Sequence, residues 1–206
     1  MNLPRLIIFE GADAAGKSTV CDEYLKALAP QGIAAKLLAF PGNCPGTIGH
    51  LVYQLHHDPH SMGVERLTAA SLQALHIAAH LDAIESVIVP TLEAGETVVL
   101  DRYWWSTWVY GLVGGASPRV LQSLIDTERL AWGRWLPSIV FYVTRSFPLR
   151  NEPIETWESL RSEYDALATR EKENYPVYIL SNDGDLAGTV KHALTRSFGD
   201  KEVRLK

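Results

Sequence analysis

The chain has 206 residues, of which 47% are hydrophobic and 21% charged, and its formal net charge is -5. This composition predicts one buried core and a single domain over residues 1–206, and the negative charge disfavours partners such as nucleic acid or an anionic membrane. The only cysteines, Cys21 and Cys44, are too few for a disulfide framework or a zinc site. The first expected strand starts close to Met1 with no signal peptide, and the apolar stretches fall short of a membrane span. We therefore expect a cytoplasmic protein.

The N-terminal segment carries the pattern G-x-x-x-x-G-K-[ST], between an apolar strand expected over 6–9 and a helix expected from Lys17 to Ala29. Its glycines let backbone N–H groups converge on phosphate oxygens, and the helix N-terminus adds its positive dipole end. Lys17 can bridge the outer phosphates, and the Ser18 hydroxyl can ligate Mg²⁺. The residues predicted to hold phosphate are Gly11, Ala14, Ala15, Gly16, Lys17, Ser18 and Thr19.

A second strand is expected over 33–40, and it ends in a loop rich in proline and glycine that begins at Phe40 and Pro41. Loops at the C-terminal ends of strands are where open α/β sheets bind ligands. A polar stretch that includes His56, His57 and His60 then follows a helix and reads as a loop.

Helical spacing of apolar residues from Arg66 to Leu92 predicts a long helix, which Pro90 kinks or ends. His76 and His80 lie with Gln73 along one edge of its apolar face. Three interpretations stay open for these histidines: lining a pocket, which we prefer, packing in the core, or binding a metal.

A third strand over 97–100 delivers Asp101 and Arg102 at its carboxyl end, and this arrangement is typical of the Walker B element that holds Mg²⁺. Three tryptophans follow closely, and they favour a buried helix over a stacking wall for a base. The remaining expected elements are helices over 104–112, 118–132, 154–173 and 186–198, and strands over 138–143 and 177–180. Strands that alternate with helices predict an α/β protein with a mostly parallel sheet covered on both faces.

Taken together, Phe9 to Thr19, Phe40-Pro41-Gly42 and the pattern Asp101-Arg102-Tyr103-x-x-Ser106-x-x-x-Tyr110 resemble the thymidylate kinase family of nucleoside monophosphate kinases. The resemblance implies a three-layer α/β/α P-loop kinase fold with a five-stranded sheet. It also implies phosphoryl transfer from ATP, with Mg²⁺ as cofactor held by Ser18 and Asp101. The implied partners are ATP and a nucleotide-like acceptor, and a homodimer is common among relatives.

The same resemblance assigns roles on the acceptor side. Asp13 would bond the sugar 3′-hydroxyl, Arg102 would contact the acceptor phosphate, and Tyr110 would pack against the sugar. The alternatives are purely structural roles: a buried ion pair between Asp101 and Arg102, and a Tyr110 that packs in the core. The residues implied for acceptor binding are Asp13, Phe40, Pro41, His76, His80, Arg102, Ser106 and Tyr110.

This sequence also departs from the family pattern. Gly42 and Asn43 stand where relatives usually place an arginine, His76 and His80 replace an aromatic residue and a further arginine, and Gly111 replaces a glutamine. A neutral histidine does not reproduce the bidentate bonds of arginine, so the acceptor stays open.

The expected lid is short, about residues 145–153. Arg145 and Arg150 are its candidates for a catalytic cation, beside Lys17, Asp13 and Arg102. A solvated surface turn is the alternative reading of this segment.

Two further functions are considered. Because the arginine near Gly42 is missing, the protein could be a deoxynucleoside kinase whose acceptor is unphosphorylated. Because the acceptor side is altered, it could also be a nucleotide-binding module that has lost phosphoryl transfer.

Overall fold

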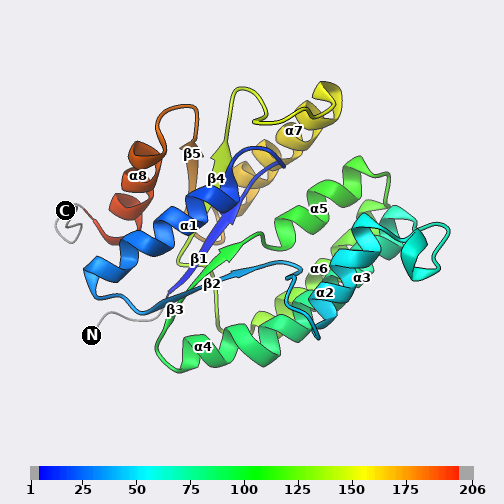
Figure 1. Cartoon of the computed structure of the whole chain (residues 1–206), viewed down its shortest axis with the longest axis horizontal. Helices are drawn as coiled ribbons and strands as arrows, with labels where there is room; N and C mark the ends of the chain where they lie inside the picture. Colours follow the sequence, from blue (N-terminus) through cyan, green and yellow to red (C-terminus); the bar gives the residue numbers. More distant parts are fainter. Residues whose placement is uncertain (1–4, 200–206) are drawn as a thin grey trace.

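The computed structural model describes residues 5–199, in which a five-stranded parallel sheet lies between two layers of helices (Figure 1). The strand order is β2-β3-β1-β4-β5, and every neighbouring pair is parallel. The strands are β1 (Leu6–Glu10), β2 (Ala35–Ala39), β3 (Thr97–Asp101), β4 (Ile139–Thr144) and β5 (Val177–Ser181). The predicted three-layer α/β/α architecture is thus confirmed.

The three central strands are almost fully buried because both of their faces are covered. Along β1, Leu6 and Ile8 face one hydrophobic cluster, while Ile7 and Phe9 face the other, as the two-residue period of a strand requires. Helices α1 (Lys17–Leu28) and α8 (Leu186–Phe198) cover the second cluster. The first is covered mainly by α5 (Trp104–Val113), α6 (Pro118–Trp132) and α7 (Ile154–Glu171).

The tryptophans that follow β3 belong to this first cluster. Trp104 and Trp105 are buried and do not line the cavity beside Arg102, and Trp108 packs against the cluster from its edge. The preferred interpretation, a buried helix, therefore fits the structure, and these rings form no stacking wall.

Two helices that are consecutive in the chain lie side by side beyond the carboxyl end of β2 (Figure 1). Helix α2 (Ile48–His57) begins at Thr47, whose side chain accepts a hydrogen bond from the His50 N–H at 3.1 Å. His56 and His57 form its last turn, so the expectation that they lie in a loop after a helix was wrong. Helix α3 (Ala69–Ala83) begins three residues later than expected at Arg66, because Thr68 caps it.

The long helix neither ends nor breaks at Pro90. A π-helical turn, η3 (Ile84–Ile88), follows α3, and α4 (Val89–Glu93) continues in the same direction with Pro90 in its first turn. Proline lacks an N–H and crowds the carbonyl four residues earlier. The carbonyl four residues before Pro90 lies within the wider π turn, and this turn lets the helix accommodate the proline.

By length and composition alone, the continuous helix Ala69–Glu93 is apolar enough to cross a membrane, contrary to the expectation from the sequence. In the fold this helix packs against α2, α5 and α6, and a buried core helix satisfies the same length and composition.

Candidate active site

The phosphate loop joins β1 to α1, and four successive carbonyl groups of this loop each accept a hydrogen bond. The N–H groups of Gly11, Asp13 and Ala15 also donate to protein acceptors. Within residues 5–199 the N–H groups of Ala14, Gly16 and Lys17 have no such acceptor, and these groups can face a phosphate. The four donors come from the helix that follows the loop and from two distant parts of the chain. They are Lys17 Nζ to Ala12 O at 2.8 Å, Trp157 Nε1 to Asp13 O at 2.8 Å, Leu149 N to Ala14 O at 2.8 Å, and Asn182 Nδ2 to Ala15 O at 2.9 Å.

The two motif glycines have conformations that other residues rarely adopt. Gly11 has φ +144°, and a Cβ there would lie 2.4 Å from the Val143 carbonyl oxygen. Gly16 has φ +87°, and a Cβ there would lie 2.5 Å from Asn182 Nδ2. The turn of the loop and its contact with β4 and with Asn182 therefore both require glycine.

Lys17 is 5% exposed and lies under the loop. Burial, and next to it the positive charge of Arg102, lower the pKa of Lys17 to about 8, against the opposing effect of Asp101 and other carboxylates. Its ammonium group is thus mostly protonated at neutral pH and suited to an anionic ligand. Thr19, also predicted to hold phosphate, is exposed in the first turn of α1.

Ser18 and Asp101 meet at the start of α1 and the end of β3, where Ser18 Oγ donates to Asp101 Oδ2 at 2.7 Å. The other oxygen, Asp101 Oδ1, is buried and has no hydrogen-bond partner. A hydroxyl beside an unpartnered carboxylate oxygen is a donor set that Mg²⁺ accepts. These two residues therefore fit the metal predicted for them.

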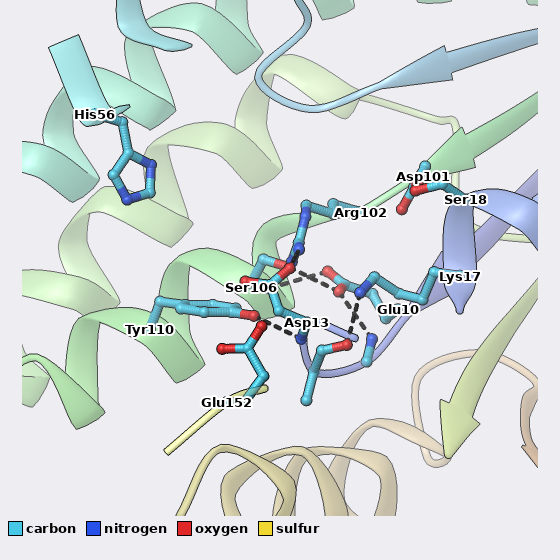
Figure 2. Close-up of polar contacts among 12 residues, drawn as sticks. Glu10, Asp13, Lys17, Ser18, His56, Asp101, Arg102, Ser106, Tyr110 and Glu152 are labelled. Atoms are coloured by element: carbon cyan, nitrogen blue, oxygen red, sulfur yellow. Dashed lines mark hydrogen bonds and ion pairs between the residues drawn. The ribbon is translucent and has the colours of Figure 1, made fainter. Parts of the chain in front are cut away.

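Arg102 turns from β3 toward the phosphate loop (Figure 2). Its guanidinium group pairs with the Asp13 carboxylate, donates to Ser106 Oγ at 2.9 Å and lies over the Tyr110 ring. Burial alone would raise the pKa of Asp13, but the charges of Arg102 and Lys17 outweigh it and hold that pKa below its ordinary value. The alternative of an Asp101 to Arg102 ion pair is not what the structure shows.

Glu10 is a site residue that the sequence analysis missed. Its buried carboxylate accepts from the backbone N–H groups of Tyr103 and Ser106 at 2.6 and 3.0 Å, and from the hydroxyls of Ser106 and Tyr164 at 2.8 and 3.1 Å. Burial raises the pKa of Glu10, although Arg102 and these donors oppose the shift. Glu10 thus satisfies the N-terminus of α5 and fixes Ser106, which in turn holds Arg102.

A cavity of about 360 Å³ opens beside Arg102. The structure brings all eight residues predicted for the acceptor to its wall, from the phosphate loop, the Phe40-Pro41 loop, the end of β3, α3 and α5. Several other lining residues were not predicted from the sequence. Some lie on α2, and the others have the spacing of residues that pack one helix against another. These are Tyr53, His56, His57, Gln73 and Thr107.

The two histidines predicted on α3 have different surroundings. His80 is buried, stacks on Phe40 with ring centroids 3.9 Å apart, and its Nδ1 lies 2.8 Å from Glu128 Oε2. His76 Nε2 lies 3.2 Å from His56 Nδ1, and burial lowers the pKa of His76 to about 3. Within residues 5–199 no three His, Cys, Asp or Glu side chains are grouped to hold a metal. His76 thus lines the cavity, whereas His80 lies at its wall and is also packed in the core.

The segment 145–153 contains no helix or strand, and Leu149 attaches it to the phosphate loop. Its two arginines point to different places. Arg150 lines the cavity and pairs with Glu152 at 3.4 Å, whereas Arg145 donates to the backbone carbonyl of Asn182. The structure therefore brings Arg150, but not Arg145, to the acceptor cavity.

A tethered phosphate loop, a hydroxyl and carboxylate pair for Mg²⁺, and a cavity edged by arginine define a P-loop protein of the nucleotide kinase class. The family model for thymidylate kinase matches residues 9–177. The chain belongs to the thymidylate kinase family.

Individual relatives agree with this assignment. The thymidylate kinase of Pelodictyon phaeoclathratiforme is 35% identical over 139 residues, which are 67% of this chain and 60% of that protein. The match to the thymidylate kinase of Chlorobaculum parvum is 29% identical and covers 82% of this chain and 84% of the relative. The crystal structure of thymidylate kinase from Ehrlichia chaffeensis superposes with a TM-score of 0.75 at 18% identity, over 95% of this chain and 99% of that one, which shows the shared fold.

Proposed function

We propose that this protein transfers the terminal phosphoryl group of ATP to a nucleoside monophosphate in the cytoplasm, with Mg²⁺ as cofactor. One observation supports the proposal: the phosphate loop and the cavity meet at Asp13, a loop residue that lines the cavity and pairs there with Arg102. A donor in the loop and an acceptor in the cavity would therefore face each other across the Arg102 guanidinium.

Phosphoryl transfer depends mainly on positioning and on neutralising charge. The loop amides and Lys17 would bind the ATP phosphates, with Lys17 exchanging the Ala12 carbonyl for phosphate oxygens. Arg102 would contact both the acceptor phosphate and the transferred group. Mg²⁺, when held by Ser18 and Asp101, supplies charge neutralisation at the phosphate oxygens.

Asp13 and Arg150 complete the acceptor side. Asp13 would accept a hydrogen bond from the sugar hydroxyl of the acceptor, because its carboxylate is ionised and 40% exposed at the cavity wall. Arg150 would add a second positive charge from the lid.

The proposal is tested by a coupled ADP-release assay with ATP, Mg²⁺ and a panel of nucleoside and deoxynucleoside monophosphates. At least one acceptor should raise ADP release well above the Lys17→Ala variant. No stimulation by any acceptor would refute the proposal, and higher rates with unphosphorylated nucleosides would favour the deoxynucleoside kinase alternative. ATP binding without any transfer would favour a module that only binds nucleotide.

Dimer formation, which is common among relatives, stays a prediction that sedimentation analysis can check.

A further inference from the structure

The half of the acceptor cavity away from the phosphate loop carries no fixed positive charge. Its wall comes from α2, α3 and α5, and the arginines that line the cavity, Arg102 and Arg150, lie on the phosphate-loop side. Figure 2 shows His56 directed from α2 toward the cavity, well separated from Lys17 and Asp101. An acceptor whose phosphate meets Arg102 would place its base among these uncharged side chains.

Gln73 is the first polar group at this end. The residue is 4% exposed and lines the cavity, and its amide has no hydrogen-bond partner among residues 5–199. Gly111 on α5 makes room for it, because a Cβ there would lie 3.1 Å from Gln73 Cγ. Because this amide is not among the fully buried atoms that lack a partner, it reaches the cavity, and a ligand that pairs with it would replace water there. Exchange of its oxygen and nitrogen by a flip lets the same amide either donate or accept.

Thr107 is the second group. It is 2% exposed and lines the same cavity, and its Oγ1 is buried without a partner. Rotation of the side chain about χ1 would turn this hydroxyl toward the cavity, where it could donate to a carbonyl oxygen or accept from an amino group.

His56 and His76 form the third group. Their bonded nitrogens, His56 Nδ1 and His76 Nε2, lie 3.2 Å apart, so one hydrogen is shared between two neutral rings. If His76 donates, His56 Nε2 carries a hydrogen and is itself a donor; in the opposite arrangement His56 Nε2 is an acceptor. Burial lowers the pKa of both rings, which keeps them neutral and preserves both arrangements at pH 7.

We propose that this cavity accepts nucleoside monophosphates with either a keto or an amino base edge, because Gln73, Thr107 and the His56–His76 pair can each donate or accept. An arginine at this end would only donate and would reject an amino edge. The inference rests on the proposed function and extends it to the range of acceptors, with Gln73 as a residue that determines specificity.

The experiment compares deoxyuridine monophosphate with deoxycytidine monophosphate, which differ only at the keto or amino edge of the base. For the natural sequence we expect kcat/KM values within about tenfold of each other, since neither edge leaves a group unpaired. A preference above about a hundredfold for one of them would overturn the inference while leaving the proposed function intact. If no monophosphate is phosphorylated, the proposed function itself fails.

Two variants test the role of Gln73. Gln73→Met keeps the length but removes both hydrogen-bonding atoms, so kcat/KM should fall about tenfold for both substrates. Gln73→Glu, assayed at pH 8, can only accept and should shift the ratio at least about tenfold toward the cytidine nucleotide. Gln54→Glu, on the exposed side of α2, is the matched control and should leave the ratio unchanged.

Calorimetric ADP binding checks that the phosphate loop of each variant is intact. Unchanged kcat/KM for both substrates in Gln73→Met, or an unchanged ratio in Gln73→Glu with ADP bound normally, would refute the assignment of Gln73.

Discussion

Trp157→Phe tests whether a tether from α7 positions the phosphate loop. The change keeps an aromatic ring but removes the indole N–H that donates to Asp13 O at 2.8 Å. Loss of this bond costs about 1 kcal/mol. Because Trp157 is only 3% exposed, the smaller ring leaves a void that costs about another 1–2 kcal/mol. The free energy of unfolding should therefore fall by about 2–3 kcal/mol, and Tm by roughly 4–12 °C for a chain of this size.

The catalytic effect should exceed what this loss of stability explains. Asp13 pairs with Arg102 at the cavity, so a shift of its backbone misplaces both groups relative to the acceptor. We expect kcat/KM for the acceptor to fall about tenfold or more, with the affinity for ADP changed by less than about threefold. Steady-state kinetics and calorimetry measure the two quantities at a temperature well below Tm.

The matched control is Trp108→Phe, which truncates a half-buried tryptophan whose ring faces Arg170 at 5.1 Å and which lies outside the cavity wall. If both variants have acceptor kcat/KM values within twofold of each other, the tether does not position the site and the reasoning is wrong.

Three other predictions follow from the site. Lys17 has a pKa of about 8, and only its protonated form attracts phosphate. The kcat/KM for ATP should therefore be constant below pH 8 and fall roughly tenfold per pH unit above it. A kcat/KM that stays constant up to pH 9.5 would contradict this prediction. Asp101→Asn keeps an oxygen that can accept from Ser18 but loses the charge, so the Mg²⁺ concentration for half-maximal rate should rise roughly 10–100-fold in a metal titration. Arg150→Ala should lower kcat at least about tenfold while Arg145→Ala changes it less than threefold, and equal losses would show that position in the cavity does not matter.

Local features of the sequence were enough to predict the donor side of the proposed site. Gly11, Gly16, Lys17 and Ser18 lie within eight residues, so their spacing alone fixes a turn, a helix start and a phosphate-binding surface. The carboxyl end of β3 was recognised for the same reason, because an apolar strand and its terminal Asp101 are adjacent in the chain.

Long-range contacts were beyond such reasoning. Trp157 and Asn182 hold the phosphate loop from more than 140 residues away, and no local pattern marks either of them. Glu10 lies just after the strand expected over 6–9, and no role was predicted for it. The fold places it under α5, where it accepts from Tyr103, Ser106 and, on α7, Tyr164. Sequence periodicity reports which face of an element is buried, and it does not report which partner covers that face.

The sequence alone therefore determined the α/β class, the phosphate loop and the strand end that faces it, because each depends on residues that are neighbours in the chain. The tertiary structure decided which side chains form the acceptor cavity, since α2, α3 and α5 meet there only after the sheet has brought them together. Gln73 shows the difference: its position on a helix could be predicted from spacing, but its close packing against Gly111, where a Cβ would lie 3.1 Å from Gln73 Cγ, appears only in the fold.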